Sequence, residues 1–326
     1  MNCIYSEHNT QKAVWAFWPS SLCDYHDKGV PVQKSFARFV SAISMHTPVF
    51  VAVSEHEYDR ARFIIPKHIT MYKISYDGVY SDDLNLKWLS EDGEPRVSIG
   101  KSISHLARTV LEDLNKNHSI SFSENEFPSQ LDFETDGAGT FVILESSLNK
   151  CGFDSESVAD RLKKFGAVNK ILIVKDNEFP DIRIDSVRNL LRFVIPGVVI
   201  VNNIPNNENN PLYRLFSYVY TLIAGEKNID GKEFKILTIP FGKYEGVVYH
   251  PDSEQYKYSV NSSYLNFLIT NQSIVLPLIN PEKDNQILIK MHEIMGDFGV
   301  DVNGVEACDL LADGLDFHKL TMPVYK

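Results

Sequence analysis

Apolar residues along the chain follow two alternating patterns, one typical of buried strands and one typical of amphipathic helices. Compact apolar runs rich in β-branched residues predict strands buried on both faces. These runs are residues 13–18, 48–53, 140–144, 197–201 and 273–278. Apolar residues spaced three and four apart predict helices with one polar, solvated face. These stretches are residues 32–45, 101–115, 155–165, 212–224 and 285–298.

A helical stretch followed by an apolar run recurs five times, which predicts an α/β fold built from five similar units. Each apolar run is expected to be the inner strand of its own unit. Asp136-Gly-Ala-Gly139 lacks the spacing of a dinucleotide-binding or phosphate-binding loop, so it predicts a hairpin turn. Ser155 is expected to cap the helix that begins there.

Composition removes several classes of function. The 32 Lys and Arg against 43 Asp and Glu give a net charge of −11, which disfavours nucleic acid and anionic membrane surfaces as partners. No apolar stretch approaches the roughly 20 residues of a membrane-spanning helix. The first residues show no secretory signal, so we expect a cytoplasmic protein. The four Cys are scattered and no His pair has metal-ligand spacing, so neither a metal nor a cofactor is expected.

Several segments, in order along nearly the whole chain, resemble the agmatine deiminase and bacterial peptidylarginine deiminase family. They are Trp15-Ala-Phe-Trp-Pro19, Asp136-Gly-Ala-Gly-Thr140, the stretch from Asn189 to Gly197, Ser262-Ser-Tyr-Leu-Asn-Phe267 and the stretch from Gly314 to Pro323. The resemblance implies the pentein fold, an α/β propeller of five pseudo-repeated ββαβ units around a central channel. It would make residues 1–326 a single domain of five blades. Arg192 falls where the family also has Arg, so we expect it to be structural.

Guanidine hydrolysis in that family requires a thiolate nucleophile, a His that moves protons and carboxylates that hold the guanidinium. In the ending His318-Lys319-Leu320-Thr321, Lys319 stands where the family carries its catalytic Cys. Ser186 stands at the position of the family's His, and Arg188 at that of a following Asp. We therefore expect no catalytic residues, and a degenerate site made of Lys319, His318, Ser186 and Arg188.

Two further acidic motifs of the family are altered. Its Glu-Gly-Gly-Ser motif corresponds to residues 129–132, where Asp132 or the nearby Glu134 would have to be reoriented to replace the acid. Its Trp-x-Arg-Asp-Thr-Gly-Pro motif has no counterpart in residues 81–95, although Asp82 and Asp83 are near. Loss of selection on a duplicated gene would also produce such changes.

The changed residues replace a thiol and a carboxylate by cations. Lys319 and Arg188 in one pocket would repel each other unless an anion compensates them. We therefore expect a non-hydrolytic binding or regulatory protein for a small polar or anionic ligand, held by Lys319, Arg188, His318 and Trp18. Self-association, as a homo-oligomer, is compatible with this role.

Other interpretations stay open at this point. Internal ion pairs could fill the pocket, with Lys319 on Asp316 or Asp313 and Arg188 on Asp185. An active enzyme could use rearranged chemistry, either a Schiff base on Lys319 or another thiol. The candidate thiols are Cys308 and Cys151. A deiminase-type hydrolase of C–N bonds is the third alternative.

Overall fold

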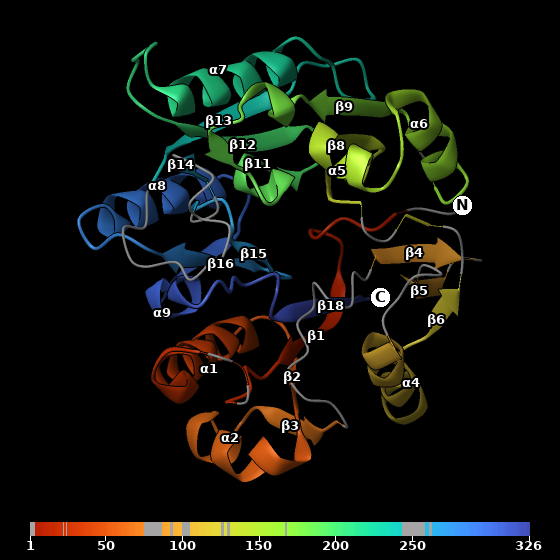
Figure 1. Ribbon diagram of the computed structural model, residues 1–326, viewed down its shortest axis with the longest axis vertical. Coiled ribbons are helices and arrows are strands. Elements are labelled where there is room, and N and C mark those ends of the chain that lie inside the picture. The colour runs from red at the N-terminus through yellow and green to blue at the C-terminus, as the bar shows by residue number, and fades with distance from the viewer. Residues whose placement is uncertain are drawn as a thin grey trace.

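A computed structural model describes residues 4–21, 23, 25–74, 87–91, 94–99, 105–124, 127–128, 131–166, 168–242, 258–260 and 263–326. Within these residues, five sheets share one pattern of strand pairing. An antiparallel pair of strands is extended by a further strand parallel to one of them, and a helix lies between the two parallel strands (Figure 1). The fold is therefore mixed α/β, as the sequence predicted.

The first sheet joins the two ends of the described chain. Its strand order is β18-β1-β2-β3. β18 and β1 are antiparallel, with Trp15 opposite Met322. The loop that precedes β18 carries His318 and Lys319, so this pairing fixes their position. The elements are β1 (Gln11–Phe17), α1 (Val30–Ser44), β2 (Val49–Val53), α2 (Tyr58–Ile64), β3 (Thr70–Lys73) and β18 (Thr321–Tyr325).

The other four sheets each have three strands and follow one another along the chain. The second contains β4 (Lys87–Glu91), β5 (Glu94–Ile99), α4 (His105–His118) and β6 (Phe122–Glu124). The third contains β7 (Phe133–Thr135), β8 (Thr140–Leu144), α5 (Glu145–Lys150), α6 (Ser155–Lys163) and β9 (Lys170–Val174). The fourth contains β11 (Leu191–Ile195), β12 (Val198–Asn203), α7 (Pro211–Ala224) and β13 (Lys235–Pro240). The fifth contains β15 (Leu268–Ile269), β16 (Ser273–Leu278), α8 (Asp284–Gly296) and β17 (Asp301–Glu306).

Short elements connect these sheets. A two-stranded parallel pair joins segments that are far apart in the chain. The strands of this pair are β10 (Ile182–Arg183) and β14 (Tyr258–Ser259). A short helix, α9 (Cys308–Ala312), precedes the loop that leads to β18. The 3-10 turns within the described ranges are η1 (His26–Gly29), η2 (Glu55–Glu57), η3 (Asp176–Glu178) and η4 (Val187–Asn189).

One part of the sequence prediction is wrong. Residues 13–18 and 48–53 are not inner strands of two units, because β1 and β2 are parallel neighbours in one sheet. The sequence analysis did not predict the strands of the second sheet. Its strands β4 and β5 carry Lys87, Glu91, Glu94 and Arg96, so they lack a continuous apolar stretch.

The other predicted strands and helices agree with observed elements to within a few residues. The turn from Asp136 to Gly139 connects β7 and β8, which confirms the predicted hairpin. The start of α6 differs in detail, because Asp154 rather than Ser155 is the N-cap. The Asp154 carboxylate accepts from the backbone N–H groups of Glu156 and Ser157, and the Ser157 hydroxyl completes a capping box. The first predicted residues of α4, 101–104, lie outside the described residues.

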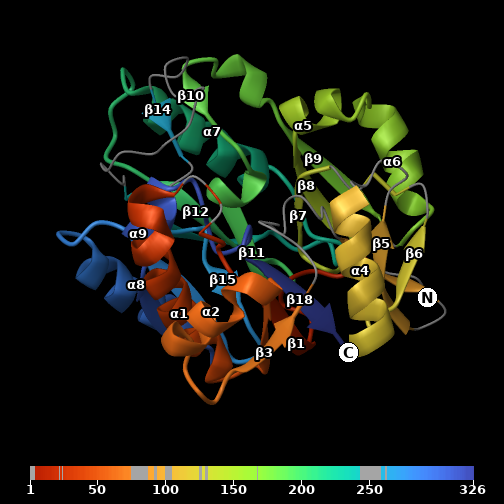
Figure 2. The same ribbon diagram turned by 60° about the horizontal axis from the view of Figure 1, so that its bottom comes forward.

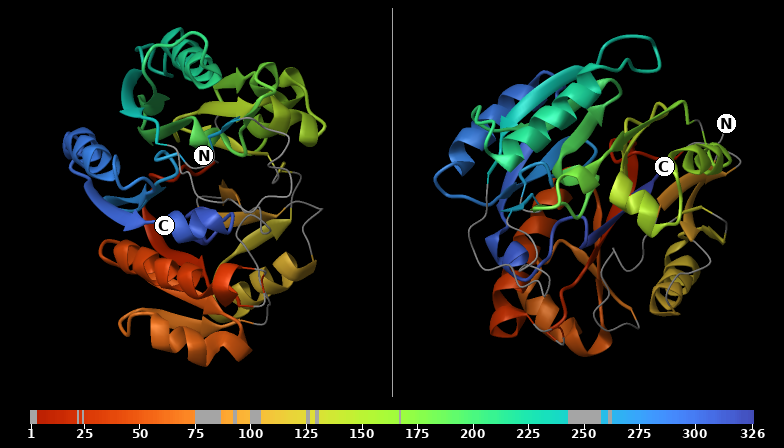
Figure 3. Two further views of the ribbon diagram at one scale, coloured as in Figure 1. Left: turned by 60° about the vertical axis from the view of Figure 1, so that its left-hand side comes forward. Right: turned by 45° about the horizontal axis from the view of Figure 1, so that its top comes forward.

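The helices pack on the outside of the sheets and fill the spaces between neighbouring ones. α1 contacts β16 and β17 of the fifth sheet as well as β2 of its own sheet. In the same way α8 contacts β13 of the fourth sheet, and α7 contacts β9 of the third. Figure 2 shows β11, β15 and β18 nearer the middle of the molecule than α1 and α8, and the two views of Figure 3 show helices on the outer sides of the sheets. In the described part of the chain, none of the helices combines the length and the apolar character needed to cross a bilayer.

An aromatic stack holds the C-terminal loop against α1. The rings of Phe39 and Phe317 lie with their centroids 4.1 Å apart and their planes at 8°. Both residues are buried in the largest apolar core cluster, which joins the first, fourth and fifth sheets. Because Phe317 directly precedes His318, this stack positions the loop that carries the candidate site residues.

We predict that replacing Phe39 by Ala will lower the free energy of unfolding by about 3–5 kcal/mol, because it removes a fully buried ring. Phe63, on α2, is 92% exposed and provides the matched control. Phe63→Ala should change stability by less than about 0.5 kcal/mol. Urea denaturation followed by circular dichroism measures both values, and equal effects of the two changes would contradict the assignment of Phe39 to the core.

Candidate functional site

A buried guanidinium lies where four segments of the chain meet. Arg192, on β11, has a fully buried side chain. Its Nε donates to Glu134 Oε1 on β7 at 3.0 Å, and its Nη2 donates to Glu7 Oε2 at 2.5 Å. Its Nη1 donates to the backbone carbonyls of Leu265 and Phe267. Two carboxylates therefore compensate one buried cation, as a charge without bulk water requires.

Glu7 connects the segment before β1 to this guanidinium. Besides Arg192, its carboxylate accepts from the backbone N–H of Ile269 at 2.6 Å and lies 3.1 Å from Nε2 of His318. Burial alone would raise the pKa of Glu7, but Arg192, His318 and the Ile269 N–H lower it to about 2. For Glu134, burial dominates and raises the pKa, although Arg192 opposes this effect.

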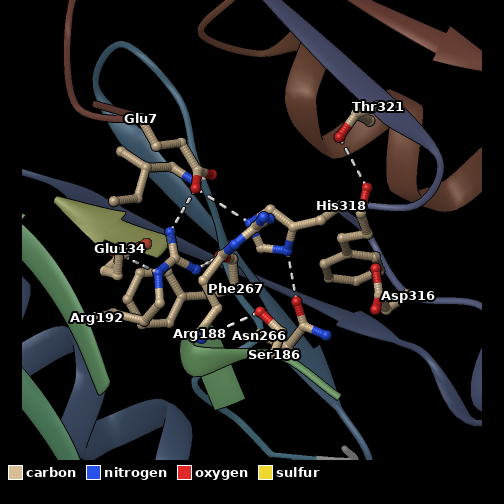
Figure 4. Close-up of polar contacts among 12 residues, drawn as sticks. Glu7, Glu134, Ser186, Arg188, Arg192, Asn266, Phe267, Asp316, His318 and Thr321 are labelled. Atoms are coloured by element: carbon tan, nitrogen blue, oxygen red, sulfur yellow. Dashed lines mark hydrogen bonds and ion pairs between the residues drawn. The ribbon is translucent and has the colours of Figure 1, made fainter. Parts of the chain in front are cut away.

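His318 lies between an acid and an amide. Its Nε2 faces Glu7 and its Nδ1 lies 2.5 Å from Oδ1 of Asn266 (Figure 4). Burial lowers the pKa of His318, Glu7 opposes this effect, and Arg188 and Arg192 lower it further. The site therefore contains an imidazole whose two nitrogens both have protein partners.

Lys319 bonds within its own loop. Its backbone N–H donates to Asp316 Oδ1 at 2.8 Å, and its Nζ donates to the carbonyl of Gly314 at 2.9 Å. Burial would raise the pKa of Asp316, but Lys319 and His318 lower it. Asp316 is one of the two carboxylates that the sequence analysis considered as ion-pair partners of Lys319. The other, Asp313, accepts from the backbone N–H of His26.

Arg188 and Ser186 share a carboxylate from another unit. Arg188 Nη2 lies 3.8 Å from Asp132 Oδ1, and the Ser186 hydroxyl donates to the same oxygen at 2.9 Å. The second oxygen of Asp132 accepts from the backbone N–H of Val187 at 2.6 Å. An internal pair for Arg188 therefore exists with Asp132, whereas Asp185 pairs with Arg183 at 2.9 Å.

These side chains form one group, which we call the central cluster. Electrostatic coupling of Arg188 to Glu134 and to His318 connects the Asp132 pair to the Arg192 network. Its members are Glu7, Asp132, Glu134, Ser186, Arg188, Arg192, Asn266, Asp316, His318 and Lys319. Of the predicted site residues, it contains Lys319, His318, Ser186 and Arg188.

Trp18 packs apart from the hydrogen bonds of the central cluster. Its indole is 2% exposed, donates from Nε1 to Glu57 Oε2 at 2.7 Å and meets the ring of Phe36 edge to face. Its role in ligand binding stays a prediction. Asp82 and Asp83 lie outside the described residues.

The alternative thiol nucleophiles have unfavourable surroundings. Burial raises the pKa of Cys308, and the neighbouring Asp284 raises it further. Its Sγ lies 3.6 Å from the carbonyl of Ile279. Burial also raises the pKa of Cys151. Both thiols are therefore protonated at neutral pH, whereas a nucleophile needs the thiolate.

A small pocket adjoins the cluster on the side of His318. Asn266, Asp316 and Ser263 are its polar lining residues, and the rest of the lining is apolar. The apolar residues come from the end of β16 and the residue after it, from α9 and the residue before it, and from the loop that precedes His318. Its free space is about what a single water molecule needs.

Glu7 and Asn266 were missed by the sequence analysis. Asn266 lies inside the segment Tyr264-Leu-Asn-Phe267, which supported the resemblance, but nothing in the segment indicated a contact with His318. Glu7 is separated from Arg192 by 185 positions and from His318 by 311. Arg192 was predicted to be structural, and its contacts with the backbone of two residues and with two acids agree with that role.

Comparison with known proteins supports the resemblance along the whole chain. An assigned agmatine deiminase of Photobacterium profundum is 22% identical over 351 residues, covering 98% of this chain and 95% of that protein. Another, from a Marinomonas species, is 25% identical over 349 residues, covering 98% and 93%.

Solved structures show the same fold. An agmatine deiminase of Enterococcus faecalis superposes with a TM-score of 0.83 at 21% identity, covering 100% of this chain and 96% of that one. The C. jejuni agmatine deiminase gives a TM-score of 0.81 at 16% identity, with the same coverage. The family model described as Porphyromonas-type peptidyl-arginine deiminase matches residues 3–90 and 132–324. The chain therefore belongs to the Porphyromonas-type peptidyl-arginine deiminase family.

Proposed function

We propose that this chain is a family member that does not hydrolyse guanidines and instead acts as a binding or regulatory protein. The observation that carries the proposal is Lys319. At the position where the resemblance places a thiol, an ammonium group donates to the carbonyl of Gly314. An ammonium has no lone pair with which to attack the substrate carbon. It therefore cannot form and release the covalent intermediate that a thiolate forms. The resemblance places Ser186 where the family has a His that moves protons. The Ser186 hydroxyl donates to Asp132.

The carboxylates of the central cluster support the same proposal. A guanidinium substrate needs carboxylates that are free to accept two parallel hydrogen bonds. Here Glu7 and Glu134 accept from Arg192, and Asp132 accepts from Ser186 and Val187. A bound guanidinium would have to share these carboxylates with the protein's own donors.

The charges of the cluster favour internal pairing over an anionic ligand. Three cations, Arg188, Arg192 and Lys319, lie among four carboxyl groups, namely Glu7, Asp132, Glu134 and Asp316. Even with Glu134 protonated, three cations meet three carboxylates. We therefore place internal ion pairs first, and an anion bound by Lys319, Arg188 and His318 stays the second prediction.

The proposal includes the propeller arrangement. We infer that the five sheets are blades around the central cluster. Two observations support this: α1 of the first sheet packs on the fifth, and the cluster collects side chains from β7, β11 and the loop before β18. The binding role would then use the outer surface of the blades, either for a second copy of this chain or for another protein.

The enzymatic alternative has less support. A Schiff base on Lys319 needs an amine that is free to reach a carbonyl substrate, whereas its Nζ is held by a hydrogen bond to the carbonyl of Gly314. The names of the relatives support a deiminase-type hydrolase, and only an activity measurement separates that alternative from the proposed role.

We predict that the purified protein releases no ammonia and forms no ureido product from agmatine or from a peptidyl arginine. Lys319→Cys should remain inactive, because Ser186 and Arg188 still replace the residues that would move the proton and hold the guanidinium. A colorimetric ureido assay measures this, with the Enterococcus faecalis agmatine deiminase as the positive control. Turnover by the unchanged chain would refute the non-hydrolytic role.

We also predict that Arg192→Met lowers the free energy of unfolding by about 3–5 kcal/mol, because it leaves Glu7 and Glu134 buried without their cation. Arg38 is the matched control, since its pairs with Glu306 and Asp309 are on the surface and its side chain is 52% exposed. Arg38→Met should cost less than about 1 kcal/mol. Urea denaturation measures both, and a small loss for Arg192→Met would show that the pairs do not hold the centre together.

A further inference from the structure

The orientation of the Asn266 amide is set by a neighbouring carboxylate. Asp316 receives a hydrogen bond from the Asn266 side chain, and its lowered pKa keeps it ionised at neutral pH. An ionised carboxylate accepts hydrogen bonds and donates none, so the amide nitrogen of Asn266 must face Asp316. The amide oxygen is therefore the atom that faces Nδ1 of His318, at 2.5 Å.

The other nitrogen of His318 also faces an acceptor. Nε2 lies 3.1 Å from Glu7 Oε2, and Glu7, whose pKa is about 2, is ionised. A neutral imidazole has one N–H, whereas an imidazolium has two. Only the imidazolium satisfies both contacts, and in the neutral ring one nitrogen lone pair points at an acceptor oxygen.

We propose that His318 is a proton-operated switch that opens a site for one water-sized molecule between its ring and Asn266. The imidazolium bridges Glu7 and Asn266. The neutral ring keeps its proton on Nε2, because a hydrogen bond to a carboxylate is stronger than one to an amide oxygen. The contact between Nδ1 and Asn266 Oδ1 then separates.

A water molecule fits the opening chemically. It carries two O–H donors and can bridge Nδ1 and the amide oxygen, which are both acceptors. The small pocket beside Asn266 and Asp316 is lined mostly by apolar side chains, and His318 is not among its lining residues, so the opening would be a separate space next to it. Protonation of His318 removes one of the two acceptors and closes the site.

The charged groups around the ring set the pH at which it switches. Glu7 faces it from the segment before β1, Arg188 from η4, Arg192 from β11 and Asp316 from its own loop. Burial and the two guanidiniums together outweigh the acids and lower the pKa of His318. The neutral, open state therefore predominates at neutral pH. Because the unfolded chain binds this proton more tightly, the stability that His318 contributes is present above about pH 6.5 and is lost as the pH falls below that value.

The test is nitrogen NMR of the histidine rings in the full chain, with the His318 signals assigned by their loss in His318→Gln. At about pH 7.5 we expect the proton on Nε2 and a bare Nδ1, and both nitrogens protonated in acid, with a midpoint below about 6.5. A neutral ring that carries its proton on Nδ1 would overturn the proposal. So would a ring that stays doubly protonated at about pH 7.5, or one that never gains the second proton down to about pH 4.5.

The variant Asn266→Ala tests the bridge separately. It removes the oxygen that accepts from Nδ1–H of the imidazolium, so the midpoint should move down by about one pH unit. The ring of His46, which lies beside Asp301 at 3.4 Å, is the internal reference, and its signals should not change. An unchanged His318 midpoint would show that the Asn266 amide oxygen does not accept a hydrogen bond from Nδ1–H of His318. None of these measurements depends on a guanidine substrate, so their outcome is distinct from that of the activity assay.

Discussion

The centre of this fold depends on the compensation of one buried guanidinium. The side chain of Arg192 is not exposed to solvent, so protein groups must compensate its charge. Its N–H groups donate to two acids and two backbone carbonyls. These partners come from the segment before β1, from β7 and from the residues that lead into β15, so one side chain sets the distances among three parts of the chain. Glu7 also contacts Nε2 of His318, so it connects the Arg192 network to the C-terminal loop. Besides the β1–β18 pairing and the Phe39–Phe317 stack, this charge helps to hold the C-terminal loop against the segment around Glu7.

Under the proposed function, this chain keeps the fold of its family but not the family's chemistry. The fold rests on apolar packing and on Arg192, which belong to the core and to the polar links between sheets. The chemistry would rest on a thiol, a His and an acid, and the resemblance predicts Lys319, Ser186 and Arg188 at the corresponding positions. Each replacement forms a bond within the protein, to Gly314 or to Asp132. Such bonds stabilise the fold without requiring a substrate, which is why fold and function have to be argued separately.

Local patterns in the sequence predicted the longer helices and the most apolar strands, because burial on one or both faces leaves a periodic signal. The signal failed for β4 and β5, whose strands mix Lys87, Glu91 and Arg96 with apolar residues. It also could not show that residues 48–53 pair with residues 13–18, since pairing is a relation between segments and not a property of one. The replaced positions were found by resemblance, but their partners were not. Glu7 and His318 are 311 positions apart, and nothing near either residue indicates the other.

The central claim is that the chain's own side chains occupy the place of a guanidinium substrate. Isothermal titration calorimetry with agmatine tests it most directly, because binding is measured whether or not any reaction follows. The account predicts only the heat of dilution up to about millimolar agmatine, since Glu7 and Glu134 are committed to Arg192. Saturable binding at about micromolar strength, lost in Glu134→Gln, would contradict it.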